Sequence, residues 1–125
     1  MIAKEKFRVC PDTGFKVFDT TEKLIKINAV VAVVFLAVGG LFGLLVALTR
    51  WPAVHLLPAD LFYLVLTAHG ADVLLFWIVF FEVAVLYFAG SVLLNVRLAA
   101  PRWAWAAFIL MLVGAVMANV AVLQG

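Results

Sequence analysis

Three long apolar runs constrain the fold of this chain more than any other feature of its sequence. They cover about Ile27–Leu48, Leu61–Leu94 and Trp103–Leu123. A helix that crosses a bilayer needs roughly 20 apolar residues, because each residue advances it by 1.5 Å. Each run is long enough, so the sequence predicts an all-α integral membrane protein with three transmembrane helices. The second run is longer than a span requires, so we expect its helix to tilt or to project beyond the lipid.

The composition supports a membrane protein. Apolar residues make up 68% of the 125 residues and mean hydropathy is +1.23, whereas ordinary soluble domains are about 45–50% apolar. The remaining polar residues could not cover a soluble globule of this size, so lipid must take the place of water. A signal peptide is not expected, because the first apolar run starts late and is too long.

Basic residues gather on one side of the predicted membrane. Six of the nine Lys and Arg residues lie in the mixed polar segment 1–26, and Arg97 and Arg102 lie in the second loop. The first loop has only Arg50. By the positive-inside rule, segment 1–26 and the second loop are cytoplasmic, and the first loop and C-terminus are outside. We therefore expect a multi-pass plasma-membrane protein in contact with lipid, and no nucleic-acid partner.

Local signals mark helix starts and one helix contact. Gly39 and Gly43 form a small-xxx-small pair, which either permits close approach of another helix or simply reflects the frequency of glycine in such spans. Candidate start or capping signals precede all three helices: Asp19 or Thr20, Pro58 with Asp60, and Pro101.

The second run contains three ionisable residues, His69, Asp72 and Glu82. Such groups are costly inside a membrane, so each raises a functional hypothesis. At 100° per residue, Asp72 lies about 60° from His69 and Glu82 about 140° from it. We therefore expect His69 and Glu82 to belong to different sites.

His69 is the strongest candidate for cofactor binding. It lies on the order of 13 Å below the outer end of its helix. Its neighbour Gly70 has no side chain and would let a large planar group approach. Neutral imidazole is a good axial ligand of haem iron. The alternative is a histidine that hydrogen-bonds a neighbouring helix.

The other polar residues have plainer interpretations. For Asp72 we favour a structural hydrogen bond over a proton-pathway role or an arginine partner, and for Asn119 a bond between helices. Glu82 is expected to be neutral, because desolvation disfavours the charged form; it either relays protons or bonds a neighbouring helix. His55 is expected to be solvated in the outer loop.

Cys10 begins a Cys-Pro-Asp-Thr-Gly stretch that resembles half of a zinc knuckle, but no second cysteine follows, so we expect a free thiol. Three tryptophans are expected to lie at the membrane interfaces: Trp51, Trp103 and Trp105.

The stretch Leu66-Thr67-Ala68-His69-Gly70, within a long aromatic-rich helix, resembles the second helix of haem–copper oxidase subunit I. In that family, a Thr-x-His element supplies one axial ligand of the low-spin haem. The resemblance extends over roughly Glu22–Leu123. Two flanking elements also resemble the family: the glycine-rich Gly40-Leu41-Phe42-Gly43 of the first span, and Arg97, Pro101 and Trp103 to Trp105 at the entry to the third.

Within the superfamily the chain looks closest to the B-type, or b(o/a)3-like, oxidases and their nitric oxide reductase relatives. The A-type enzymes have an asparagine- and aspartate-rich proton-entry motif between their second and third helices. The corresponding loop here, Asn95–Arg102, lacks that motif.

The resemblance implies a low-spin haem of b or a type with His69 as axial ligand of its iron. It implies the N-terminal, three-helix part of a terminal oxidase subunit that reduces oxygen to water and translocates protons. Electrons would come from cytochrome c or a cupredoxin through a subunit II-like partner. The active-site haem, the copper and the remaining helices would lie outside this chain, on a second polypeptide or on a continuation of this one.

Three alternatives remain open at this point. A nitric oxide reductase would have the same fold and haem ligand, with iron in place of copper. A non-catalytic membrane subunit would have no haem of its own. A small stand-alone b-type cytochrome would need a second histidine at matching depth, which His55 does not provide. Hydrolytic and phosphoryl-transfer chemistry is not expected, because the sequence has no phosphate loop, serine–histidine pair or HExxH.

Overall fold

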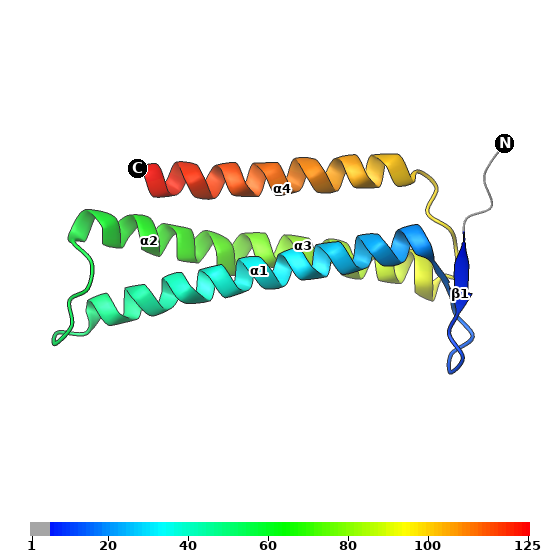
Figure 1. Cartoon of the computed structure of the whole chain (residues 1–125), viewed down its shortest axis with the longest axis horizontal. Helices are drawn as coiled ribbons and strands as arrows, with labels where there is room; N and C mark the ends of the chain where they lie inside the picture. The colour runs from blue at the N-terminus through cyan, green and yellow to red at the C-terminus, as the bar shows by residue number, and fades with distance from the viewer. Residues whose placement is uncertain (1–5) are drawn as a thin grey trace.

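The computed structural model describes residues 6–125, and this part of the chain contains three helices that are long and apolar enough to cross a membrane (Figure 1). They are α1 (Asp19–Arg50), the composite second span (Ala59–Leu93) and α4 (Pro101–Gln124). The prediction of an all-α, three-span membrane fold is confirmed.

The helix of the first span starts before the predicted membrane span does. Helix α1 begins at Asp19, whereas the predicted span began at Ile27, so the polar lead-in and the span form one continuous helix. Its N-cap residue is Phe18, which makes no side-chain cap hydrogen bond, so Asp19 and Thr20 are inside the helix and do not cap it. Two salt bridges at i,i+4 spacing, Asp19–Lys23 and Glu22–Lys26, support this polar first turn. The polar residues therefore extend the helix.

The second span is interrupted by two π-helical turns. It consists of α2 (Ala59–Ala71), η1 (Asp72–Phe76), α3 (Trp77–Tyr87) and η2 (Phe88–Leu93). A π turn has more residues per turn than an α-helix, so it rotates every later side chain about the axis. The step of 100° per residue, from which the direction of Glu82 was predicted, therefore does not hold across η1.

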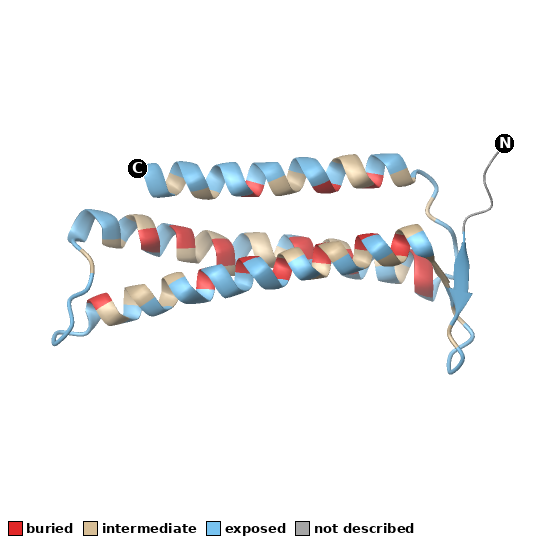
Figure 2. Ribbon diagram, in the orientation of Figure 1, coloured by how far each residue is buried: buried red, intermediate tan, exposed pale blue. Residues whose placement is uncertain are grey.

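Helix α1 packs antiparallel against the second span, and α4 lies alongside (Figure 1). Buried positions recur along α1 and the second span, whereas α4 is exposed over most of its length (Figure 2). An aromatic cluster joins all three spans. The ring of Phe80 stacks on Phe35 of α1 at 5.6 Å between centroids and meets Phe108 of α4 edge-on at 6.2 Å.

A short β-hairpin, which the sequence analysis did not anticipate, precedes α1. Strands β1 (Phe7–Val9) and β2 (Lys16–Phe18) pair antiparallel. The Cys10 N–H donates to Phe15 O, the Gly14 N–H donates to Cys10 O, and Gly14 has a φ of +69°. The stretch that resembled half of a zinc knuckle is therefore a hairpin turn that needs glycine at a left-handed position. Cys10 forms no disulfide, and a hydrogen bond from Thr13 lowers the pKa of its thiol.

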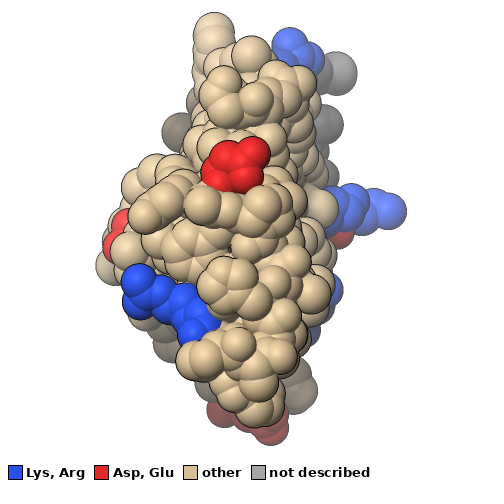
Figure 3. Space-filling model, turned by 90° about the vertical axis from the view of Figure 1, so that its left-hand side faces the viewer, with Lys and Arg blue, Asp and Glu red and all other residues tan. Residues whose placement is uncertain are grey.

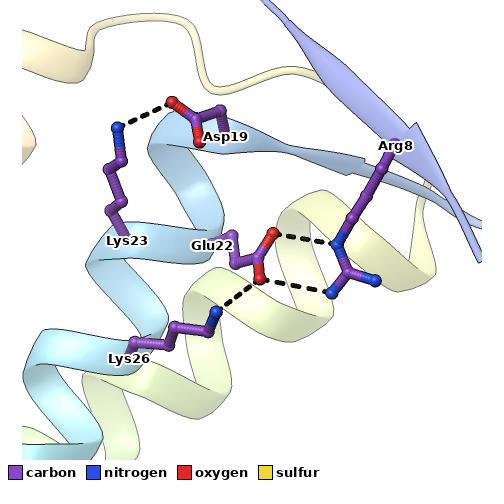
Figure 4. Close-up of polar contacts among 5 residues, drawn as sticks. All are labelled: Arg8, Asp19, Glu22, Lys23 and Lys26. Carbon is purple, nitrogen blue, oxygen red and sulfur yellow. Dashed lines mark hydrogen bonds and ion pairs between the residues drawn. The ribbon is translucent and has the colours of Figure 1, made fainter.

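An ion-pair cluster fixes the hairpin to the start of α1 (Figure 4). The Arg8 guanidinium donates to both carboxylate oxygens of Glu22, at 3.0 and 3.2 Å. Lys26 donates to the same carboxylate at 2.6 Å. Such paired geometry holds Arg8 in one orientation, although exposed ion pairs contribute little free energy.

Candidate functional site

The His69 side chain lies between the first two spans. Its Nδ1 atom is 2.7 Å from the backbone oxygen of Gly39 on α1. A carbonyl oxygen only accepts hydrogen bonds, so Nδ1 is the ring nitrogen that carries the hydrogen in the neutral tautomer that fits this contact. The other ring nitrogen, Nε2, then keeps a free lone pair, and no described residue donates a hydrogen bond to it. The ring is thus held in one tautomer with one nitrogen available to a ligand.

Two glycines of α1 create the space for this arrangement. A Cβ atom at Gly43 would lie 2.7 Å from His69 Cε1. A Cβ atom at Gly39 would lie 2.7 Å from Val73 Cγ2 and 2.8 Å from Asp72 Cβ. These distances are shorter than van der Waals contact, so a side chain at Gly39 would push the second span away and one at Gly43 would displace the His69 ring. Of the two interpretations that the sequence left open for Gly39 and Gly43, the structure shows close helix approach, and the partner is the helix turn that contains His69.

The expectation that Gly70 lets a large planar group approach stays a prediction, because only the space around this glycine can be described. A Cβ atom there would meet nothing within 4 Å, so open space lies beside His69 on that side of α2. The described residues do not need a glycine at this position for packing. The space itself is what a large planar group next to the imidazole requires.

Asp72 and Asn119 join the second span to α4. Asn119 Nδ2 donates to Asp72 Oδ1 at 2.7 Å, and Asp72 is fully buried. The expected structural hydrogen bond of Asp72 and the expected interhelical bond of Asn119 are one and the same contact, and both predictions are confirmed.

The remaining candidates lie apart from His69. Glu82 is exposed on α3 and about 20 Å further along the span at 1.5 Å per residue, and it makes no hydrogen bond or ion pair to another residue in 6–125. His55 is exposed in the first loop, with a φ of 45°. Trp51 and Trp103 are exposed at helix ends, as expected of interfacial tryptophans, whereas Trp105 is half-buried.

Within residues 6–125, no three His, Cys, Asp or Glu side chains come together as a metal-binding group. The site therefore offers one imidazole nitrogen, Nε2, on a ring that the Gly39 carbonyl holds through Nδ1 and that Gly43 contacts. The hydrogen bond from His69 to a neighbouring helix, the alternative interpretation of this residue, is present in the structure, and its acceptor, the Gly39 carbonyl, was not identified from the sequence. The small-xxx-small spacing on α1 was the available signal.

These features define a multi-pass α-helical membrane protein with a histidine fixed between its first two spans. A family model described as cytochrome c and quinol oxidase polypeptide I matches residues 23–125, and the chain belongs to this family, subunit I of the haem–copper oxidases. The resemblance predicted from the sequence is confirmed at the level of the family. Membership makes the chain part of an oxidoreductase complex. No curated protein and no solved structure matches the chain significantly.

Proposed function

We propose that His69 Nε2 is an axial ligand of a low-spin haem, of b or a type, through which electrons enter a terminal oxidase. The observation that carries this proposal is the hydrogen bond between His69 Nδ1 and the Gly39 carbonyl. Histidines that bind metals almost always donate their other ring N–H to a carbonyl, a carboxylate or water. In a neutral imidazole held by this bond, Nε2 is the nitrogen with the free lone pair that ligation requires.

The surroundings of the ring fit a large planar group with a metal at its centre. Gly43 lies against one edge of the imidazole, so the ring cannot rotate freely, and open space lies beside Gly70. The ring is half-buried, inside an apolar span. When bound, the haem supplies one-electron transfer, and the chain supplies position and electronic tuning.

The Gly39 carbonyl is the tuning group in this proposal. By accepting a hydrogen bond from Nδ1–H, it increases electron density on the imidazole and would make Nε2 a stronger donor to iron. A stronger axial donor stabilises the oxidised iron, so this contact is one way in which the chain sets the reduction potential.

Family membership and the charge distribution support the wider role. We propose that the whole complex reduces oxygen to water, translocates protons, is of the B type, and receives electrons from cytochrome c or a cupredoxin through a subunit II-like partner. The active-site haem, the copper and the remaining helices of subunit I would come from outside these 125 residues.

We further propose a plasma-membrane location with the N-terminus in the cytoplasm. The hairpin and the loop that contains Arg97 and Arg102 lie at one end of the spans (Figure 1). The opposite end, seen in Figure 3, is largely uncharged, and residues 51–59 contain no Lys or Arg. The positive-inside rule then places the hairpin end in the cytoplasm. Cys10, at the hairpin turn, should resist an impermeant thiol reagent added outside intact cells; labelling from outside would reverse the topology.

The test of haem ligation is His69→Ala in the assembled, purified complex. Low-spin iron needs two strong axial ligands, so the variant should lose the low-spin absorption and electron-paramagnetic-resonance signals, together with electron entry from the donor. Glu82→Gln is the control, because it changes a polar group of the same span without touching His69; its low-spin spectrum should be unchanged. An assembled His69→Ala complex with a full six-coordinate low-spin spectrum and normal turnover would refute the proposal.

A further inference from the structure

A groove follows α1 and α4 from the hairpin end of the spans. The two helices start at this end and run in the same direction (Figure 1). Here the groove is a hollow of about 440 Å³. Its lining consists of Lys23, Lys26, Ile27, Val30, Trp105 and Phe108. The second hollow, of about 340 Å³, continues it, because its lining begins one helical turn further along, at Val31 of α1 and Leu112 of α4.

The side chains that line the groove are bulky. Below the lysines, α1 contributes only Ile, Val and Phe side chains, from Ile27 to Phe42. The small residues Gly39 and Gly43 of α1 face the second span instead. Helix interfaces in membranes are enriched in small residues, which let backbones approach closely. The groove lacks this feature of a helix-docking surface, whereas a flexible hydrocarbon chain can follow an uneven, bulky wall.

Trp105 forms part of the wall at the hairpin end, four residues after α4 begins at Pro101. Its half-buried ring meets Phe108 edge-on, at 6.0 Å between centroids, so its position is fixed. No residue in 6–125 accepts a hydrogen bond from its indole N–H. Tryptophan favours the headgroup level of a bilayer, where its ring contacts hydrocarbon and its N–H reaches a polar group. Trp105 therefore presents a free donor beside the two lysines.

The lysines at the mouth of the groove are not neutralised by their partners. The side chains of Lys23 and Lys26 are 63% and 71% exposed, and they pair with Asp19 and Glu22. The Glu22 carboxylate also receives the Arg8 guanidinium, so two cations share one negative charge (Figure 4). One positive charge of this cluster is left for an anionic ligand.

Positive charge is in excess over the whole hairpin end. Residues 6–26 and 95–102 together contain seven Lys and Arg against three Asp and Glu, a net charge of +4. At the opposite end, residues 50–60 contain one Arg and one Asp and are neutral overall. Basic residues next to a membrane attract anionic lipids, so the charge complementarity favours a negatively charged headgroup at the mouth of the groove.

We propose that the groove between α1 and α4 binds one anionic phospholipid of the leaflet on the hairpin side. Its phosphate lies at Lys23, Lys26 and Trp105, and one acyl chain follows the groove. The depth fits, because the nine residues from Lys26 to Phe35 advance α1 by about 14 Å. The hydrocarbon of one leaflet is about 15 Å thick, half of roughly 30 Å. The lipid fills the space between two helices that α4 leaves largely open, and its binding does not depend on haem ligation.

The test is photo-crosslinking of the purified complex in bilayers. Phosphatidylglycerol and phosphatidylcholine with the same diazirine-bearing acyl chain are the two probes, and mass spectrometry identifies the labelled peptides. Phosphatidylglycerol should label the groove at Val30 and Trp105 on the order of tenfold more than phosphatidylcholine. Equal labelling by the two probes would overturn the proposal. So would a groove that neither probe labels while the exposed Val33 is labelled, because another polypeptide would then cover it.

The double variant Lys23→Gln with Lys26→Gln tests the headgroup contact. Labelling by phosphatidylglycerol should fall to the level of phosphatidylcholine. Lys6→Gln with Lys16→Gln is the matched control, because it removes two charges from the same membrane surface at residues that do not line the groove. This control should keep the preference. Equal losses in the two double variants would show diffuse attraction to the surface, and the bound lipid would be refuted.

Val30→Trp tests the path of the acyl chain and keeps both lysines. The larger side chain fills the hollow beside Trp105, so labelling of Trp105 by phosphatidylglycerol should fall severalfold. Val33→Trp is the control, because Val33 is 62% exposed, similar to Val30 at 57%, and lies outside the groove lining. Unchanged labelling in Val30→Trp would contradict the proposed path. The readout involves no haem signal, so failure of this inference and failure of the haem proposal can be distinguished.

Discussion

The second span has two neighbours, α1 and α4, and it packs against them in opposite ways. Toward α1, contact is close because Gly39 and Gly43 have no side chains, and the histidine and its neighbours fill the space. Toward α4, the polar link is a pair of side chains, Asp72 and Asn119, that reach across the gap. Within a membrane, small residues and polar bridges are the two usual means of helix association. This protein uses one on each side of the same helix turn.

The α1 and α4 helices also differ in how much of their surface is buried. Along α4 the fully buried positions are few, and an apolar groove of about 340 Å³ separates it from α1. On α4 only Ala104, Phe108 and Ala115 are buried, and the Asp72–Asn119 pair adds one hydrogen bond to the second span. Single substitutions should therefore act differently on the two sides.

The largest effect should come from Phe80→Ala, because this ring belongs to both interfaces. Phe80 is 1% exposed and contacts Phe35 of α1 and Phe108 of α4. Truncating a buried phenylalanine costs about 3–5 kcal/mol. The neighbouring Phe81 is 47% exposed, so Phe81→Ala is the control and should cost far less. Thermal denaturation of the purified complex measures both; equal losses would mean that the aromatic cluster does not join the spans.

Gly43→Ala should disturb the interface between the second span and α1 without affecting the interface with α4. The new methyl group would lie 2.7 Å from the His69 ring, and such overpacking costs about 1–3 kcal/mol. We expect a displaced imidazole and an altered low-spin haem spectrum. At Gly40 an added Cβ meets nothing within 4 Å, so Gly40→Ala is the matched control. The same spectral change in both variants would indicate a general effect of helix stiffening.

Asn119→Leu should weaken the interface between the second span and α4 and leave the His69 ring in place. Interhelical hydrogen bonds in membranes contribute about 0.6–1.7 kcal/mol, so the loss should be smaller than for Gly43→Ala. Melting of the complex should shift slightly while the haem spectrum is kept. Met117→Leu, at an exposed position two residues away, is the control. A lost low-spin signal in Asn119→Leu would mean that the two sides are coupled through Asp72.

The smallest effect is expected at the membrane surface, outside both interfaces. Arg8→Gln removes the paired contact with Glu22 that fixes the hairpin, and exposed ion pairs contribute about 0–1 kcal/mol. Melting should hardly change, although proteolysis at the hairpin should become faster. Lys16→Gln, on the paired strand, controls for the loss of a positive charge. A large drop in melting temperature for Arg8→Gln alone would show that the hairpin supports the spans.

The sequence by itself determined the number of spans, the position of His69 within the second span and the family. Apolar length is a property of consecutive residues, so it can be read without knowing any partner. Gly39 and Gly43 were also recognisable from their spacing. Asp19 and Thr20 indicated a helical lead-in, but the apolar run began only at Ile27, and a count of apolar residues cannot show that the polar turn with the Glu22–Lys26 pair continues into the span as one helix.

Only the tertiary structure decided what each polar residue touches. The π turn at Asp72–Phe76 rotates the rest of the second span, so a regular helical wheel could not give the direction of Glu82. The bond from His69 to Gly39 joins residues 30 apart, and that from Asn119 to Asp72 joins residues 47 apart. Such contacts depend on how the helices rotate and approach one another, and apolar side chains favour many rotations almost equally in lipid. The close contact at Gly39 and Gly43 and the Asp72–Asn119 hydrogen bond select one of these rotations. The site therefore forms only when the spans pack together.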